Sequence, residues 1–189
     1  MSFNWENLLS QLMQLLPAGG AVYIAYSGGL DSSVLLHAMA QLRPELEHEL
    51  HAIHADHGLQ ADSASWVDHC DRQCAALGIQ LHKVHLNLRV PPGESLEAAA
   101  RDARYQAFST ILGAGDVLLT AHHADDQVET VLLQLLRGAG VSGLAGMPAI
   151  KPWHQGWLAR PLLPFSRQEL ELYARDNKLH WMEDASNQD

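Results

Sequence analysis

The chain has 189 residues, of which 47% are hydrophobic and 18% are charged. This length fits one α/β domain with a sizeable core and is too short for two domains of ordinary size. Twenty-two acidic and 12 basic residues give a net charge of −10. A chain that binds nucleic acid by itself is expected to be basic, because Lys and Arg neutralise the phosphates. No run of 18 apolar residues and no basic start of a secretory signal occur, so neither a membrane-spanning nor a secreted protein is expected.

The first predicted elements are a helix, a buried strand and a second helix. An amphipathic pattern over 4–16, followed by Pro17, indicates a packed helix rather than a membrane anchor. The apolar run 21–26 predicts a buried strand, and residues 30–41 predict a helix. The sequence SGGLDSS, at residues 27–33, joins this strand to this helix.

The two glycines of this junction allow a tight turn whose backbone N–H groups point outward. The positive end of the following helix adds a partial charge, so a phosphate fits at this position. Asp31 is the carboxylate of the loop and the candidate ligand for a magnesium ion bound with that phosphate. An ordinary strand–turn–helix corner with serine caps is the alternative interpretation.

The residues of this junction distinguish between the known classes of nucleotide-binding loop. A Walker loop requires a lysine before its Ser or Thr, but no lysine precedes Lys83, and the dinucleotide pattern GxGxxG is absent from the junction. The string SGGLDSS instead resembles the pyrophosphate loop of the N-type ATP pyrophosphatases, which cleave ATP to AMP and pyrophosphate. This resemblance implies that ATP binds at Ser27, Gly28, Gly29, Leu30, Asp31 and Ser32.

The middle of the chain is expected to add two strands and two helices. The strands are predicted over 50–55 and 79–84, and the helices over 62–77 and 94–112. The only two cysteines, Cys70 and Cys74, are spaced i, i+4 on the first of these helices. Their apolar neighbours indicate core positions in a protein of a reducing cytoplasm.

Two features of this middle region are candidates for ligand binding. The second strand ends in Ala55, Asp56 and His57, which should border the nucleotide because ligands gather at the carboxyl ends of parallel strands. On helix 94–112, Arg101 and Arg104 lie one turn apart, so one of them can reach a phosphate. The alternative for Arg104 is an ion pair with Asp102 or Glu97. The 12 histidines fit no zinc spacing with supporting cysteines, so a His-based metal site is not expected.

A strand predicted over 116–121 is followed at once by HHADDQVET at residues 122–130. Ionisable side chains at this position again lie at the carboxyl end of a strand. In the helix expected over 125–137, Asp126 and Glu129 are three residues apart, so their carboxylates should share a face. The alternative is a capped helix with a solvated acidic first turn, which the helix dipole favours.

The last part of the chain is rich in Gly and Pro before it becomes helical. From 139 to 165, one short strand near 157–163 is expected among loops. A helix over 166–178 begins with a capping box formed by Ser166 and Glu169. The alternation of strands and helices predicts an α/β fold, a parallel twisted sheet with helices on both faces, in a single domain 1–189.

Four motifs together resemble the tRNA(Ile)-lysidine synthetase family. They are EAAARDARY at 97–105, HHADDQVET at 122–130, LLRGAGVSGLAGM at 135–147 and EDASNQD at 183–189. That family uses ATP and free L-lysine to convert the wobble cytidine of a minor tRNA(Ile) with a CAU anticodon into lysidine. The resemblance implies an adenine-nucleotide alpha-hydrolase-like (Rossmann-like) fold, Mg²⁺ with the ATP, and a cytoplasmic enzyme.

The same resemblance implies roles for individual residues. Asp126 would orient the lysine amine and take its proton, and Glu129 would help to hold that amine. Arg101 and Arg104 would act on a phosphate or on the activated oxygen. Further candidate site residues are His122, His123, Asp125 and Arg137.

The acidic net charge bears on how the chain would use its tRNA. Members of the family continue into further domains that hold the tRNA, so this chain is interpreted as the catalytic domain of a longer protein. One alternative is a tRNA cytidine thiolase, which shares the loop but carries Cys-x-x-Cys pairs that the spacing of Cys70 and Cys74 does not match. Another is a nucleotide-binding module without turnover. A homodimer is one candidate assembly.

Overall fold

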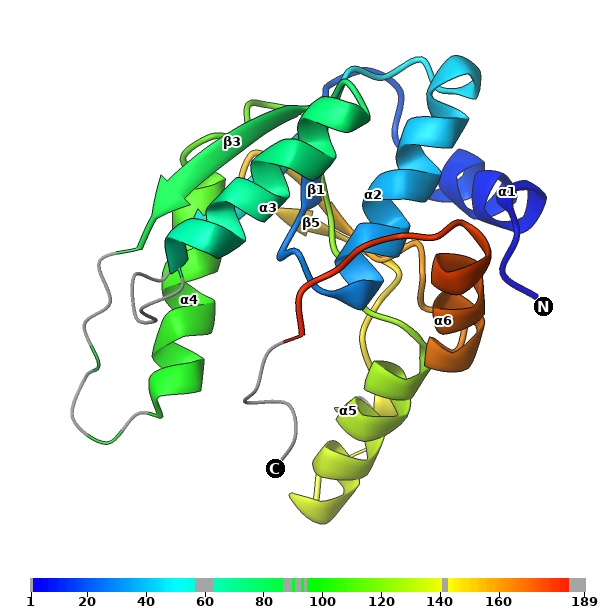
Figure 1. Cartoon of the computed structure of the whole chain (residues 1–189). Coiled ribbons are helices and arrows are strands. Elements are labelled where there is room, and N and C mark those ends of the chain that lie inside the picture. The colour runs from blue at the N-terminus through cyan, green and yellow to red at the C-terminus, as the bar shows by residue number, and fades with distance from the viewer. Residues whose placement is uncertain are drawn as a thin grey trace.

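One six-stranded sheet organises the computed structural model, which describes residues 2–56, 63–86, 90, 93, 95–140 and 143–183 (Figure 1). The strand order is β3–β2–β1–β4–β6–β5. All neighbouring strands run parallel except β5, which is antiparallel to β6. The strands are β1 Val22–Ala25, β2 Leu50–Asp56, β3 Gln80–His85, β4 Val117–Leu119, β5 Ile150–Trp153 and β6 Gly156–Ala159.

Six α-helices and two short 3₁₀ helices connect and cover these strands. The α-helices are α1 Trp5–Leu15, α2 Leu30–Leu42, α3 Ser63–Ala76, α4 Leu96–Ser109, α5 Ala124–Leu136 and α6 Arg167–Asp176. The 3₁₀ helices are η1 Arg43–Glu45 and η2 Gly143–Ala145. The longest of the described helices have 14 residues, and none of them is long and apolar enough to cross a membrane.

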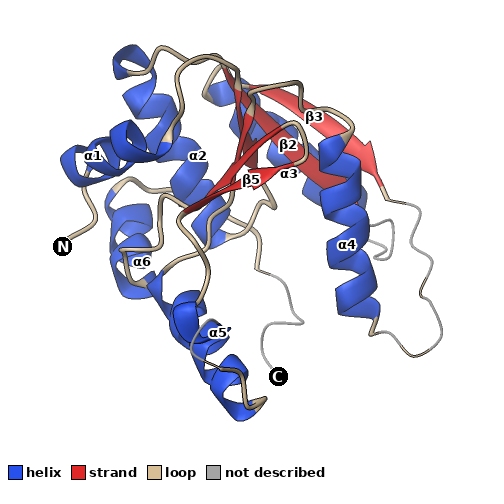
Figure 2. Ribbon diagram, turned by 180° about the vertical axis from the view of Figure 1, so that it is seen from behind, coloured by secondary structure: helices blue, strands red, loops and turns tan. Residues whose placement is uncertain are grey.

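Alternate side chains of β1 divide the core between the two faces of the sheet. Val22 and Ile24 pack in the larger cluster, which contains residues of α1, α2, α3 and α6. Tyr23 points the other way and packs with Phe108 of α4. Figures 1 and 2, seen from opposite sides, show α3 and α4 on opposite faces of the sheet. The predicted fold class, a mostly parallel sheet covered on both faces, is therefore confirmed.

The stretch between α5 and α6 differs from the prediction. The strand expected near 157–163 is β6, which ends at Ala159, and β5 was expected to be loop. The two strands form a hairpin in which Trp153 pairs with Gly156, and His154 in its turn has a φ of 51°. Pro152 lies within β5, which is the edge strand, and an edge is where a sheet tolerates a residue without a backbone donor.

Helix α5 leaves the body of the domain instead of packing along the sheet (Figures 1 and 2). None of its described residues is buried. Its apolar side chains Val128, Leu132, Leu135 and Leu136 are exposed, Leu136 to 83%. The prediction of a helix here was correct, but its apolar side chains stay exposed instead of joining the core.

Candidate functional site

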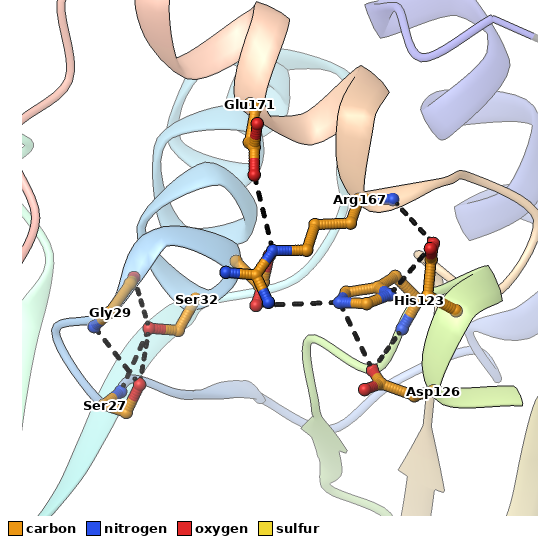
Figure 3. A network of polar contacts seen from close by, with 9 residues as sticks. Ser27, Gly29, Ser32, His123, Asp126, Arg167 and Glu171 are labelled. Atoms are coloured by element: carbon orange, nitrogen blue, oxygen red, sulfur yellow. Dashed lines mark hydrogen bonds and ion pairs between the residues drawn. The ribbon is translucent and has the colours of Figure 1, made fainter. Parts of the chain in front are cut away.

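The loop that follows β1 is folded around the hydroxyl of Ser32. Ser32 Oγ accepts a hydrogen bond from Ser27 N at 3.2 Å and donates one to Gly29 O at 3.1 Å (Figure 3). The Ser27 hydroxyl lies 2.9 Å from that of Ser32 and accepts from Gly29 N at 3.3 Å. Regular helical bonding in α2 begins with Ser33 N donating to Gly29 O. The N–H groups of the first helical turn, which have no acceptor within a helix, are thereby presented at the loop.

Two other parts of the chain hold this loop from outside. The Trp66 indole of α3 donates from Nε1 to Ser27 O at 2.6 Å. Near the C-terminus, Met182 N donates to Gly28 O at 2.9 Å. Gly28 itself has a φ of +87°, in the left-handed region that favours glycine. The shape of the loop therefore depends on residues far away in the sequence.

Replacing Gly28 by alanine is expected to destabilise the fold as well as the loop. Its Cβ would lie 2.7 Å from Trp66 Nε1 and 3.0 Å from Cys70 Sγ, in a backbone conformation that already strains an alanine. We expect a loss of about 1–3 kcal/mol in the free energy of unfolding, measured by urea denaturation.

Gly29 provides the matched control for that measurement. A Cβ at Gly29 would meet only Ser27 Oγ, at 3.5 Å, and the φ of Gly29 is −79°. Gly29→Ala should therefore leave the unfolding free energy within about 0.5 kcal/mol of its original value. Equal losses for the two variants would contradict this account of the loop.

The loop opens into a cleft of about 900 Å³ at the carboxyl ends of the strands. Of the loop residues predicted to bind ATP, all but Gly28 line it, and Gly28 O accepts a hydrogen bond from Met182 N. The other walls come from α4, from the start of α5, from α6 and from the segment before Glu183. Their ionisable members are Arg101, Arg104, His122, His123, Asp126, Arg167, Glu171, Arg175 and Glu183.

His123 connects the loop to the first turn of α5. Its side chain is only 5% exposed, and its Nε2 lies 3.7 Å from Asp31 Oδ2 and 3.6 Å from Asp126 Oδ2 (Figure 3). Asp126 Oδ2 also accepts a hydrogen bond from His123 N at 2.8 Å. Burial raises the pKa of Asp31, while the nearby His123 and Arg167 act in the opposite direction. Two carboxylates from separate elements thus line the cleft, both within 4 Å of the same imidazole nitrogen.

Asp31 fits the expected magnesium ligand. Its Oδ1 is buried and has no hydrogen-bond partner. Within the described ranges there is no group of three or more His, Cys, Asp or Glu residues placed to hold a metal ion. Mg²⁺ in nucleotide sites takes one or two carboxylates and completes its shell with phosphates and water, so a single aspartate beside the loop is sufficient.

His122 has a different environment from His123. Its Nδ1 lies 2.8 Å from the hydroxyl of Thr120. Burial, assisted by the charge of Arg160, lowers the pKa of His122 to about 4. The His122 ring is therefore neutral at pH 7 and faces the cleft as a hydrogen-bonding group without charge.

The remaining candidates on α5 do not line this cleft. Asp125 Oδ2 accepts a hydrogen bond from Arg167 N at 2.9 Å and so joins α5 to the first turn of α6. Glu129 instead borders a shallow apolar groove of about 500 Å³ on α5, together with Val128 and Leu132. Arg137 is the C-cap of α5, at the opposite end from Asp126.

Asp126 and Glu129, whose carboxylates were expected to share a face of this helix, border different hollows. Residues three apart on a helix are displaced by about 60° around its axis, and Asp126 additionally turns back to the helix start to accept from His123 N. This separation leaves Asp126 as the α5 carboxylate in the cleft. A role of Glu129 in binding lysine stays a prediction.

The other predicted positions are distributed as follows. Arg101 and Arg104 both line the cleft from α4, where the Arg101 guanidinium lies 5.8 Å from the centre of the Tyr105 ring and burial lowers the pKa of Arg104. Ala55 and Asp56 end β2 outside the cleft lining, and His85 Nδ1 lies 3.1 Å from Asp56 Oδ2. His57 lies outside the described residues, so its role in ATP binding stays a prediction.

One wall of the cleft was missed by the sequence analysis. Arg167, Glu171 and Arg175 are spaced i, i+4 and i+8 on α6, and all three line the cleft. The Glu171 carboxylate lies 3.4 Å from Arg167 Nε and 3.8 Å from Arg175 Nη2. The i, i+4, i+8 spacing was the one sequence signal for this wall. It was not informative, because the same spacing is typical of a solvent-exposed helix face.

Comparison with known proteins relates this geometry to a family. The PP-loop domain family matches residues 3–189. The chain is 53% identical over 182 residues to the tRNA(Ile)-lysidine synthase of Alkalilimnicola ehrlichii, covering 96% of this chain and 41% of that protein. It is 54% identical over 185 residues to the tRNA(Ile)-lysidine synthase of Pseudomonas aeruginosa, covering 97% and 41%. The chain thus spans about two fifths of the length of these curated relatives.

Solved structures share the fold at lower identity. The U34-tRNA thiolase NcsA from Methanococcus maripaludis has a TM-score of 0.77 at 19% identity, covering 95% of this chain and 64% of that one. The phosphoadenylyl-sulfate reductase of Candida auris has a TM-score of 0.58 at 14% identity, covering 95% and 82%. The sequence matches confirm the predicted resemblance to tRNA(Ile)-lysidine synthases, and the chain belongs to the PP-loop domain family.

Proposed function

We propose that this chain is a catalytic domain that ligates L-lysine to carbon-2 of the wobble cytidine of a tRNA(Ile) with a CAU anticodon, using ATP. The observation that carries the proposal is the cleft itself. The loop Ser27–Ser32, the carboxylate of Asp126 and the guanidinium groups of Arg101 and Arg104 all line it. The identity of about half of the residues to tRNA(Ile)-lysidine synthases supports this choice among ATP-cleaving reactions.

The first step of the proposed reaction is adenylation of the cytidine. The cytidine O2 attacks the α-phosphorus of ATP, the bond to the bridging oxygen breaks, and pyrophosphate leaves with the electron pair. Backbone N–H groups of the loop and of the first turn of α2 stabilise the charge that develops on the leaving group. Mg²⁺, held by Asp31, would supply further positive charge to the phosphates when bound.

The second step is attack of the lysine amine on carbon-2, with release of AMP. The amine arrives as an ammonium ion and must lose a proton before it can act as a nucleophile. Asp126 is placed to orient that ammonium and take the proton, because its carboxylate faces the cleft and its side chain is 35% exposed. His123 keeps this carboxylate in place through its backbone N–H.

The distribution of charge fits a catalytic domain within a longer protein. With a net charge of −10, the chain has few cations to neutralise tRNA phosphates, and those in the cleft are Arg101 and Arg104 of α4 and Arg167 and Arg175 of α6. The curated relatives are more than twice as long as the matched region. We infer that the additional part of such a protein carries most of the tRNA affinity. We also infer that the protein acts in the cytoplasm, where its tRNA substrate would be modified.

The thiolase alternative lacks a reactive sulfur in the described residues. Cys70 and Cys74 are both buried and free. Burial raises the pKa of each thiol to about 12, so neither is a thiolate at neutral pH. A sulfur-carrying cysteine needs the opposite environment, exposed and with a lowered pKa.

The proposal is tested by incubating the protein with ATP, Mg²⁺, L-lysine and a tRNA(Ile) transcript with a CAU anticodon, followed by mass analysis of the nucleosides. We expect lysidine, with one AMP and one pyrophosphate formed per modified tRNA. A transcript whose wobble base is uridine is the matched control and should remain unmodified. ATP binding without any lysidine, AMP or pyrophosphate would instead identify a nucleotide-binding module.

A further inference from the structure

The cleft contains a positively charged wall on α6 to which the proposed reaction has assigned no role. Arg167, Glu171 and Arg175 line it together with the phosphate-binding loop. Figure 3 shows the Arg167 side chain reaching from α6 toward the side of the cleft where Ser32 and His123 lie. This wall therefore faces the position at which the loop would receive a triphosphate.

The position of Arg167 is fixed relative to the loop. Its backbone N–H donates to Asp125 Oδ2 at 2.9 Å, which ties the start of α6 to the start of α5. Helix α6 also packs on α2, the helix that begins in the loop, and His37 Nδ1 of α2 lies 2.9 Å from the Tyr173 hydroxyl of α6. The guanidinium is therefore carried by a helix that is braced against both neighbouring parts of the site.

The side chain of Arg167 is also held by a partner. Its Nε lies 3.4 Å from Glu171 Oε1, while the other carboxylate oxygen lies 3.8 Å from Arg175 Nη2. Pairing through Nε leaves the two Nη groups to act as donors, and a guanidinium uses such a pair to bind phosphate oxygens. Glu171 thus acts as a positioning residue between two arginines.

An ATP polyphosphate would bring negative charge into the cleft that such a residue can offset. The loop has no lysine, the residue that provides the cation in a Walker loop, and its carboxylate Asp31 adds negative charge. Arg101 and Arg104 belong to α4, across the cleft from α6. Arg167 and Arg175 both come from the helix packed on α2, and of the two it is Arg167 whose charge affects Asp31 of the loop.

We infer that Arg167 binds the β- and γ-phosphates of ATP and the pyrophosphate that they become, with Glu171 positioning its guanidinium. This inference rests on the proposed use of ATP in the same cleft. It adds a second source of charge for the leaving group beside the backbone N–H groups of the loop. The α-phosphate would remain open toward Asp126 of α5 and toward Arg101 and Arg104 of α4, where the other substrates would react.

The test compares the binding of ATP, pyrophosphate and AMP to the unaltered protein and to Arg167→Gln by isothermal titration calorimetry. We expect Arg167→Gln to weaken ATP and pyrophosphate at least about tenfold, the usual effect of losing a charge-assisted pair, and to change AMP less than about twofold. Arg167→Lys should recover part of the loss because it restores the charge without the paired donors. Arg72→Gln, which removes an exposed arginine of α3 outside the cleft lining, should change none of the three.

Thermal unfolding separates a binding role from a structural one. Arg167→Gln keeps the backbone N–H that Asp125 accepts, so its melting temperature should match that of the unaltered protein. Unchanged ATP and pyrophosphate affinities in Arg167→Gln would overturn the inference, as would an equal loss for AMP. Failure of the unaltered protein to bind ATP would instead contradict the proposed function on which the inference rests.

Discussion

Replacing Asp126 by asparagine is expected to lower lysidine formation by at least about a hundredfold, the lower range for removing a positioned base. The asparagine keeps an oxygen that can accept from His123 N, now 2.8 Å from Asp126 Oδ2, so the start of α5 should remain intact. What it loses is the charge that attracts the lysine ammonium and the capacity to take its proton. The measurement is the initial rate of lysidine formation, with ATP affinity determined in parallel and expected to persist.

The neighbouring carboxylate offers a matched control for this substitution. Asp125 precedes Asp126 in the same helical turn, but its side chain is 59% exposed and binds Arg167 N instead of lining the cleft. Asp125→Asn preserves that hydrogen bond and should change the rate less than about threefold. A normal rate in Asp126→Asn would show that Asp126 only caps its helix. Equal losses in both variants would assign the effect to the packing of α5 on α6.

The centre of the parallel sheet was predictable because β1 and β4 are buried on both faces. Such strands are continuous apolar runs bounded by turn residues, as at β1 and β4, and each is followed by a helix with its own periodicity. In the hairpin only β6 was expected, as the strand near 157–163, and β5 was not. Strand β5 contains Pro152, and its pairing with β6 depends on an exposed turn that only the folded chain defines.

For the candidate site too, residues positioned by local sequence could be predicted, and residues brought in by packing of distant segments could not. The loop and Asp126 could be placed at the cleft in advance because each lies at the carboxyl end of a predicted strand. Arg167 and Trp66 were not found, because their helices enter the site through packing of segments that are far apart in the sequence. Glu129 was paired with Asp126 through the family resemblance and the i, i+3 spacing, but Asp126 turns back to cap its helix and Glu129 borders a different hollow.

Replacing Asp31 by asparagine should have two opposite effects, on the rate and on stability. The variant loses the carboxylate expected to hold Mg²⁺ against the phosphates. A bound metal contributes several kcal/mol to such a step, so the rate of pyrophosphate release should fall at least about a hundredfold. At the same time the folded protein should become more stable at pH 7.

The stability gain follows from burial of the carboxylate. Burial raises the pKa of Asp31 in the folded protein above its ordinary value, so the folded state binds this proton more tightly than the unfolded chain. The stabilisation from this group is fully present below the unfolded pKa and is lost as the pH rises through the folded pKa. At pH 7 the ionised carboxylate therefore destabilises the fold, and an uncharged asparagine of the same shape removes that cost.

Thermal unfolding at two pH values measures this effect directly. The melting temperature of Asp31→Asn should exceed that of the unaltered protein at pH 7, and the difference should shrink toward pH 4, where the buried carboxyl of the unaltered protein takes up its proton. Asp71→Asn is the control, because Asp71 is an exposed residue paired with Lys83 and its loss should give no such gain. A lower melting temperature for Asp31→Asn at pH 7 would show that the attraction of His123 and Arg167 for this carboxylate outweighs its burial. Asp31 would then be a structural ion-pair partner, and its unbonded oxygen would no longer support a metal ligand at the loop.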